Sequence, residues 1–202
     1  MKNLLRVLIL LAYSVVSAQP EFTPGIRAGV NFAKVSDTEL GYKTGFYAGA
    51  SAGIKFNKVY TLQPEIMFSA QGAKGDYEFD QNGINEIRHA DVSLQYVCVG
   101  VINKFEFADR ISVMVGPSID ILVDKNVAVH NDLDISIVGG LGCRIIGGLG
   151  AEFRVKKGFV STLANSDYTT SDGFFDIDNS TNLVLQLGLT YIFTTKDKPS
   201  QP

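Results

Sequence analysis

The sequence predicts an all-β fold, an eight-stranded antiparallel up-and-down transmembrane β-barrel. In the segment 182–193, NLVLQLGLTYIF, leucines and then aromatic residues occupy one face, and the other face is small, mixed and uncharged. Such a second face is typical of a strand that has lipid on one side and a filled lumen on the other. Two further observations favour this fold: the connections alternate between short and long, and the charges of the strands share one face.

The N-terminal segment 1–18 predicts a signal peptide. Lys2 and Arg6 precede a short apolar run, and Val16, Ser17 and Ala18 form a small-residue cleavage site. The run is too short to cross a bilayer as a helix. We therefore expect an exported protein whose outer-membrane barrel domain occupies residues 19–202.

Eight segments alternate with a period of two over about nine residues or more, the length that a tilted strand needs to cross a bilayer. They are 24–33, 44–56, 60–71, 91–105, 110–123, 133–145, 148–156 and 182–193. The short connections are 57–59, 106–109 and 146–147, and the longer ones are 34–43, 72–90, 124–132 and 157–181. Short turns at one rim and long loops at the other are typical of bacterial outer-membrane barrels, and an even strand count predicts that both termini are periplasmic.

Two prolines and two cysteines fall within these strands. Pro64 and Pro117 each remove a ladder hydrogen bond, so we expect a bulge or a local break at both positions. The two cysteines, Cys98 and Cys143, fall two strands apart and on opposite faces, so we expect them to be unpaired.

The alternation assigns one face of every strand to lipid and the other to the lumen. No charged residue falls on the lipid face, where a lysine at mid-bilayer would cost about 2–4 kcal/mol. The lumen of an eight-stranded barrel is filled by side chains, so inward charges must pair. The residues predicted to form a structural charge network there are Arg27, Glu65, Asp120, Asp134, Arg144, Glu152 and Arg154. The expected ion pairs are Glu65 with Arg154 and Glu152 with Arg144. A proton or ion relay is the alternative role of these pairs. Inward-facing glycines provide the space for the charged side chains.

Several short motifs carry a resemblance to a known family. They are LQPEIMFS at 62–69 with QGAK at 71–74, TGFYAG at 44–49, Gly116-Pro117, VGGLG at 138–142, 147–154 and Lys157-Gly158. Together they resemble the PorT-like outer-membrane β-barrel proteins of Bacteroidetes. The resemblance implies the barrel fold and a place in the cell envelope, and through the family's named member it implies an association with type IX protein secretion. It implies no catalytic residue. At 96–100 the chain reads YVCVG and lacks the inward acid and the proline of the family's fourth strand.

Composition and isolated motifs narrow the function classes. A net charge of −3 without a basic cluster disfavours nucleic acid as a partner. The segment 176–179 has the aspartate spacing of a calcium loop but lacks its glycine and distal glutamate, so we expect neither metal nor cofactor. His89 and His130, on the outer rim, would be the candidate bases if the barrel were an enzyme that acts on lipid A. A soluble periplasmic lipocalin-like binder is a further alternative, although it would need the opposite faces to be apolar.

The leading hypothesis is a non-enzymatic structural or interaction component of the outer membrane. Its expected partners are outer-membrane lipid and other envelope or secretion-system proteins. In the longest loop, the aromatic residues Tyr168, Phe174 and Phe175 form a candidate partner-contact patch.

Overall fold

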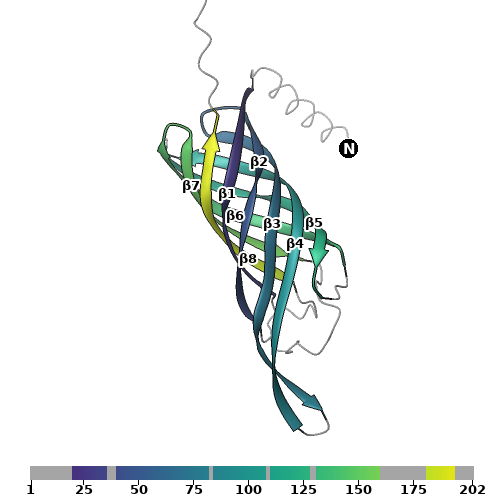
Figure 1. Ribbon diagram of the computed structural model, residues 1–202. Helices are drawn as coiled ribbons and strands as arrows, with labels where there is room; N and C mark the ends of the chain where they lie inside the picture. Colours follow the sequence, from purple (N-terminus) through teal and green to yellow (C-terminus); the bar gives the residue numbers. More distant parts are fainter. Residues whose placement is uncertain are drawn as a thin grey trace, which may run out of the picture.

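The computed structural model describes residues 20–35, 40–81, 84–107, 110–127, 131–159 and 181–193, with the backbone alone at 77–81, 84–86 and 88. The strands are β1 (Glu21–Val35), β2 (Gly41–Lys55), β3 (Tyr60–Gln81), β4 (Ile84–Phe107), β5 (Ile111–Lys125), β6 (Leu133–Ile146), β7 (Leu149–Gly158) and β8 (Asn182–Ile192). Each strand pairs antiparallel with its neighbour in sequence, and β1 pairs with β8. The result is the predicted closed up-and-down barrel, whose strands cross the barrel wall obliquely (Figure 1).

The short connections all lie at one end of the barrel. β2 turns into β3, β4 into β5 and β6 into β7 at the same end at which β1 begins and β8 finishes (Figure 1). Gly147, in the turn before β7, has a φ of 55°, a left-handed conformation that glycine adopts without strain. By the topology of bacterial outer-membrane barrels this end is periplasmic, and the opposite end is extracellular.

The segment 72–90 is a correction to the sequence prediction, because it is strand rather than a polar loop. The β3–β4 ladder runs without a register shift from Tyr60↔Phe105 to Gln81↔Ile84. β2 follows β3 only as far as Lys74, so beyond this level the two strands leave the barrel as a two-stranded hairpin. This β3–β4 hairpin projects far past the extracellular rim (Figure 1).

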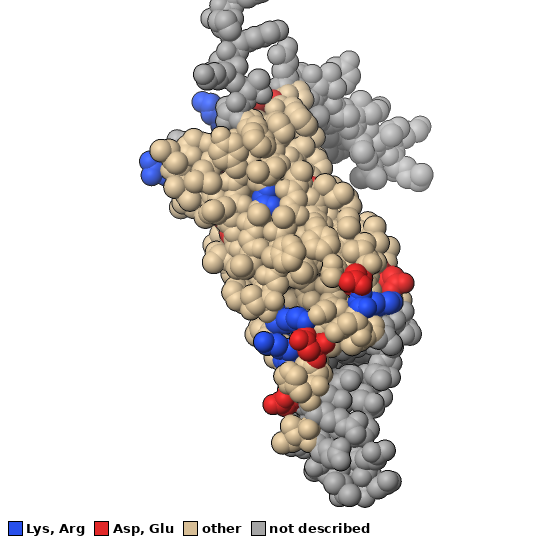
Figure 2. Space-filling view, in the orientation of Figure 1, with Lys and Arg blue, Asp and Glu red and all other residues tan. Residues whose placement is uncertain are grey.

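The outer surface of the barrel is apolar, as the alternation predicted. The side chains of Leu187 and Leu189 are each 54% exposed on the outside, and the middle of the face in Figure 2 is almost free of charge. At the periplasmic end, ring pairs such as Phe56–Tyr60 and Tyr60–Phe105 have centroids 5.6 and 5.4 Å apart and form an interfacial girdle. A soluble lipocalin-like binder would carry polar residues here, so that alternative is wrong. No helix in the described part of the chain has the length and apolar character needed to cross a bilayer.

Polar and proline residues within the wall are accommodated locally. Asn103 faces lipid, but its Oδ1 accepts a hydrogen bond of 2.9 Å from the Tyr60 hydroxyl and its Nδ2 donates to the Val115 carbonyl at 3.2 Å. At Pro64 the β2–β3 ladder has a gap, and at Pro117 the β4–β5 ladder has one, with the same register on both sides. The prolines therefore break the ladder without a bulge. The register shifts that do occur are at Tyr42/Tyr47, Gln95/Tyr96 and Arg144/Ile146.

Candidate functional site

The centre of the lumen is occupied by a guanidinium group held between two carboxylates. Arg154 on β7 has no exposed surface. Its Nη1 donates to both oxygens of Glu65 on β3 at 2.9 and 3.0 Å, across the lumen. Its Nε and Nη2 contact Oε2 of Glu152 at 3.1 and 2.8 Å. Bidentate geometry of this kind offsets the large cost of removing both charges from water.

A second guanidinium, that of Arg27 on β1, extends this cluster. Its Nη1 lies 3.5 Å from Oε2 of Glu152, and its Nη2 donates to the Gln186 amide oxygen at 2.9 Å. The Tyr47 ring lies against its other side, with the ring centroid 4.6 Å from Cζ. Gly188 provides the space for that ring, because a Cβ at this position would lie 2.1 Å from the Tyr47 hydroxyl oxygen. The glycine therefore makes room for the network, as the sequence predicted for inward glycines.

A separate buried ion pair lies on the other side of the lumen. Lys156 on β7 contacts both carboxylate oxygens of Asp120 on β5 at 2.6 Å. The same ammonium group lies 3.2 Å from the thiol sulfur of Cys98. Ser118 and Ser136 donate to Oδ1 and Oδ2 of Asp120 at 2.8 and 3.2 Å, so each carboxylate oxygen has a serine hydroxyl and the lysine ammonium group beside it.

The extracellular half of the lumen contains a buried apolar cluster. It consists of Val35, Leu40, Tyr47, Met67, Ala73, Val92, Leu94, Tyr96 and Cys98. Buried polar groups beside it bond to one another: the Asn182 amide donates to the Tyr96 hydroxyl at 3.0 Å, and the Asn31 amide donates to the Ser69 hydroxyl at 2.9 Å. The apolar cluster adjoins the charged clusters directly, because Tyr47 contacts Arg27 and Cys98 contacts Lys156, and together they fill the lumen.

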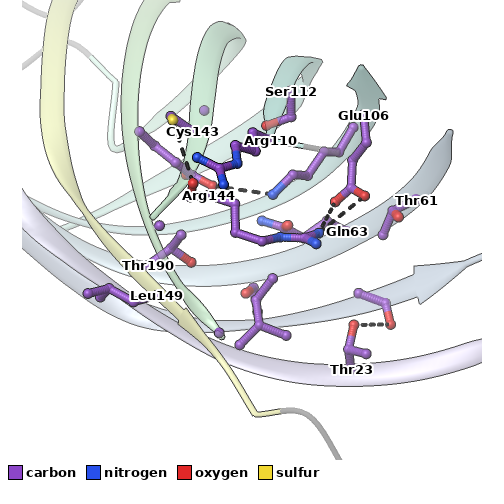
Figure 3. A pocket seen from close by; sticks show the side chains of 18 of the residues that line it. Thr23, Thr61, Gln63, Glu106, Arg110, Ser112, Cys143, Arg144, Leu149 and Thr190 are labelled. Atoms are coloured by element: carbon purple, nitrogen blue, oxygen red, sulfur yellow. Dashed lines mark hydrogen bonds and ion pairs between the residues drawn. The ribbon is translucent and has the colours of Figure 1, made fainter. Parts of the chain in front are cut away.

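The periplasmic mouth is different, because it contains a cavity of about 200 Å³ (Figure 3). Cations line it at Lys55, Lys104, Arg110 and Arg144, and acids line it at Glu21, Glu106 and Glu152. Small residues such as Gly53, Gly142 and Gly150 widen this end. Glu152 also belongs to the central cluster, so the floor of the cavity is the charged plug itself.

Within the mouth, charges pair more loosely than at the centre. Arg144 Nη2 lies 3.3 and 3.4 Å from the two oxygens of Glu106, and Lys55 lies 4.0 Å from the same carboxylate (Figure 3). Lys104 Nζ lies 3.8 Å from Oε1 of Glu152. The side chains of Arg144, Lys55 and Glu106 are more exposed than those of the central cluster, so water screens their interactions.

The structure divides the predicted charge network among four places in the lumen. Arg27, Glu65, Glu152 and Arg154 meet at the centre, and Glu65 contacts Arg154 as expected. Glu152 does not pair with Arg144, which lies at the mouth against Glu106, so that expected pair is wrong. Asp120 binds Lys156, while Asp134 accepts a hydrogen bond from the Phe159 backbone N–H at 3.2 Å near the extracellular end. The remaining partners are Lys104, Lys156 and Gln186, which face alternation also assigns to the lumen side of their strands.

The extracellular rim holds the candidate catalytic residue that the structure describes. His89 Nδ1 lies 2.7 Å from Oδ1 of Asp76, directly across the β3–β4 hairpin, and both side chains are exposed. Asp91 and Ser93 instead contact the Lys43 ammonium group. That hydrogen bond from Lys43 lowers the pKa of the Asp91 carboxyl group, which lies at the rim outside the bilayer.

Several predicted sites fall outside the described residues. They are His130, the aromatic residues Tyr168, Phe174 and Phe175, and the aspartates at 176–178. Among the residues that are described, no cluster of His, Cys, Asp and Glu has the grouping of a metal site. Both cysteines are free thiols, Cys98 buried in the lumen and Cys143 exposed.

Solved structures with the same architecture come from several bacteria. Neisserial surface protein A matches with 14% identity and a TM-score of 0.51, covering 85% of this chain and 97% of that one. Ail, the attachment invasion locus protein of Yersinia pestis, matches with 12% identity, 86% and 99% coverage and a TM-score of 0.48. OprG from Pseudomonas aeruginosa matches with 8% identity, 88% and 99% coverage and a TM-score of 0.47. At such low identity the likeness concerns the fold alone.

A match to a family model is stronger evidence of relationship than these pairwise structural similarities. Comparison with curated protein sequences gives no match. The family model described as "Outer membrane protein beta-barrel domain" matches residues 17–164, which include β1 to β7. The chain therefore belongs to the outer membrane protein β-barrel domain family, and it is a small β-barrel protein of the outer membrane.

Proposed function

We propose that this protein is a non-enzymatic interaction component of the cell envelope: a closed barrel that anchors an extracellular hairpin for contact with other proteins. The observation that carries the proposal is the closed lumen. A barrel built to transport solutes needs a continuous polar path, whereas here a buried apolar cluster and two buried ion clusters fill the lumen. A closed barrel leaves its rims, rather than its lumen, as the surfaces that can act.

The central cluster supports a structural role in place of a proton relay. Both Glu65 and Glu152 are bound by Arg154, and a guanidinium group stays protonated under all physiological conditions. A proton could not pass from one carboxylate to the other through it. We assign Arg27, Glu65, Asp120, Glu152 and Arg154 to holding the barrel closed, with Asp134 and Arg144 at its two ends.

The β3–β4 hairpin is the best candidate for the contact element. Its backbone ladder continues from Gly75↔Ala90 to Gln81↔Ile84, beyond the point where β2 pairs with β3. Two strands that project alone expose unpaired N–H and C=O groups along both edges, which another chain can extend by strand addition. Ile87 on this hairpin is 75% exposed, an apolar side chain available for contact.

The partner proposal follows from the family resemblance. The motifs at 62–69 and 44–49 resemble those of PorT-like barrels, whose named member belongs to the type IX secretion apparatus. We propose other envelope proteins as partners, secretion-system proteins among them. Tyr168, Phe174 and Phe175 would contribute a second contact patch on the same side of the membrane.

A shortened hairpin tests this function. In the variant, an Asn-Gly turn replaces residues 76–89 and joins Gly75 to Ala90, which already pair. We expect a heat-modifiable barrel of native stability that loses the photo-crosslinks that a probe at position 74, exposed at the base of the hairpin, forms in the native chain. A chain with an altered 57–59 turn is the control, since it changes the periplasmic end alone.

Two results would contradict parts of the proposal. Unchanged crosslinks in the shortened chain would remove the hairpin as the contact element. A gene deletion that leaves the secreted proteome unchanged would remove the link to secretion, while the anchoring role would still be judged by the crosslinks.

The enzymatic alternative depends on the His89–Asp76 contact of 2.7 Å. It is weakened because Asp91 and Ser93, which a catalytic arrangement would recruit, are bound to Lys43 instead. Replacing His89 and His130 together by Gln provides its test. An unchanged lipid A profile is expected, and a changed profile would favour the enzyme.

A further inference from the structure

The cavity at the periplasmic mouth is a pocket with a closed inner end. Gly147 and Leu149, at the β6–β7 turn, line its outer part, and Glu152 lies at its floor. Behind Glu152 the fully buried Arg154 closes the lumen at a distance of 2.8 Å. The cavity volume of about 200 Å³ exceeds the roughly 150 Å³ of a protein cavity that holds a benzene ring. The pocket therefore has room for an organic group.

The acids of this pocket are shared among several cations. Glu106 lies 3.3 Å from Arg144 and 4.0 Å from Lys55, and Glu152 is contacted from three sides. In the described part of the chain, the pocket and the cluster beneath it hold six cations and four carboxylates: Arg27, Lys55, Lys104, Arg110, Arg144 and Arg154, and Glu21, Glu65, Glu106 and Glu152. An excess of positive charge in a cleft with low-dielectric walls attracts anions.

Two of these cations stand directly opposite each other on neighbouring strands. The Arg144 N–H donates to the Arg110 carbonyl at 2.7 Å, which continues the Ile111↔Cys143 register of β5 and β6. Both side chains line the pocket, where Figure 3 shows them side by side. Like charges in such a position repel each other. Glu106 offsets the repulsion at Arg144, whereas the Arg110 guanidinium group forms no ion pair with any residue that the structure describes.

We propose that Arg110 and Arg144 form a binding site for a carboxylate group that enters from the periplasm, on a small organic acid or at the end of a peptide chain. Guanidinium groups match carboxylates through paired N–H···O bonds, and Lys55 on β2 adds positive charge from the opposite wall. Arg144 already contacts a carboxylate, that of Glu106, at 3.3 and 3.4 Å. A singly charged carboxylate fits better than a phosphate group, because Glu21 and Glu106 in the same lining repel a second negative charge.

The inference does not rest on the proposed role of the β3–β4 hairpin, since the pocket lies at the other end of the barrel. It also differs from simple hydration of arginines near water. Hydration predicts no preference for an acid over an amide of the same shape. The closed inner end means that a bound ligand is held at the mouth rather than conducted through the lumen.

The experiment uses the mature protein in non-ionic detergent micelles and isothermal titration calorimetry. The first probe is N-acetyl-trialanine with a free C-terminal carboxylate, and the second is its C-terminal amide. We expect the acid to bind roughly tenfold or more tightly than the amide, as the loss of a charge-assisted hydrogen bond predicts, and salt to weaken it. Acetate and succinate distinguish the sources. Tighter binding of the peptide acid would indicate a chain end, and equal or tighter binding of succinate a small organic acid.

The R110Q variant should weaken binding of the acid roughly tenfold or more. R110K should retain part of the binding, because the charge remains but the planar guanidinium group is lost. K58Q is the matched control, since it removes one positive charge from the β2–β3 turn at the same end, where Lys58 does not line the pocket. Thr23→Phe is an independent variant that fills part of the pocket, leaves every cation in place and should also abolish binding. Heat modifiability checks the folding of each variant.

Several results would overturn the proposal. They are equal binding of the acid and the amide, an R110Q variant that binds like the native protein, and a K58Q variant that loses as much affinity as R110Q. No binding of any carboxylate at millimolar concentrations would overturn it too. Inorganic phosphate that binds more tightly than every carboxylate would show that the class of ligand is wrong.

Discussion

Arg154 on β7 donates two hydrogen bonds, of 2.9 and 3.0 Å, to the two carboxylate oxygens of Glu65 on β3, straight across the barrel lumen. The arginine is fully buried, so neither group can exchange its partner for water. Removing one partner leaves an uncompensated buried charge, which costs more than the pair contributes. The contact thus links opposite sides of the barrel.

Loss of the Glu65 carboxylate should destabilise the barrel strongly. We expect Glu65→Gln to lower the free energy of unfolding by about 3–5 kcal/mol, because Arg154 then keeps one carboxylate, that of Glu152, in place of two. Urea unfolding in detergent micelles measures the change. It is followed by far-UV circular dichroism, because the chain has no tryptophan whose fluorescence could report on unfolding. The double variant Glu65→Leu/Arg154→Met removes both charges and should recover much of the loss. A single variant as stable as the native protein would contradict a structural role for the pair.

The fit of Tyr47 over β8 predicts an intolerant glycine. A Cβ at Gly188 would lie 2.1 Å from the Tyr47 hydroxyl oxygen and 2.4 Å from the Ala28 carbonyl oxygen. Gly188→Ala should therefore cost about 1–3 kcal/mol or prevent assembly into the heat-modifiable form. Gly139→Ala is the matched control, because no atom lies within 4 Å of its Cβ position. If both variants assembled and unfolded like the native protein, the lumen around Tyr47 would have room for an added methyl group.

The two thiols should differ sharply in reactivity. Cys143 is exposed, whereas Cys98 is 5% exposed and lies in the lumen beside the Lys156 ammonium group. A maleimide that enters detergent micelles, such as N-ethylmaleimide, should add about one label to the folded chain, at Cys143 on the outer face of β6, and two after unfolding, because a thiol must be accessible to react. Mass spectrometry of the folded Cys143→Ser variant should find no label. Rapid labelling of Cys98 in that variant would mean that water passes through the lumen.

Alternation of residues predicts the faces of this barrel well, but it does not predict heights along the barrel axis. Glu152 and Arg144 both face inwards, yet the stagger between strands places Arg144 at the mouth with Glu106 and leaves Glu152 at the centre with Arg154. Stagger depends on the register of each strand pair, which bulges alter. The register shift at Arg144/Ile146 in the β6–β7 ladder has no recognisable signal in the sequence.

The β3–β4 hairpin was missed although the sequence contains a signal for it. Asn82-Gly83 is a strong two-residue turn sequence, and the residues before it, DYEFD, alternate polar with aromatic. The segment resembles a loop in the sequence because its alternate residues Asp76, Glu78 and Asp80 are acidic, so the apolar alternation of the other strands stops there. Strands that leave the bilayer lose the selection for an apolar outer face, so a search for lipid-facing alternation stops at the membrane surface.

A barrel that is closed to solutes conducts no ions, which single-channel recording in planar bilayers can measure. Purified, heat-modifiable protein is reconstituted in molar potassium chloride and recorded at both polarities, with an open porin as the positive control. The apolar cluster around Tyr47 and Tyr96 and the charged cluster around Arg154 predict a baseline equal to that of a protein-free bilayer. Reproducible conductance steps that scale with salt concentration would contradict the account.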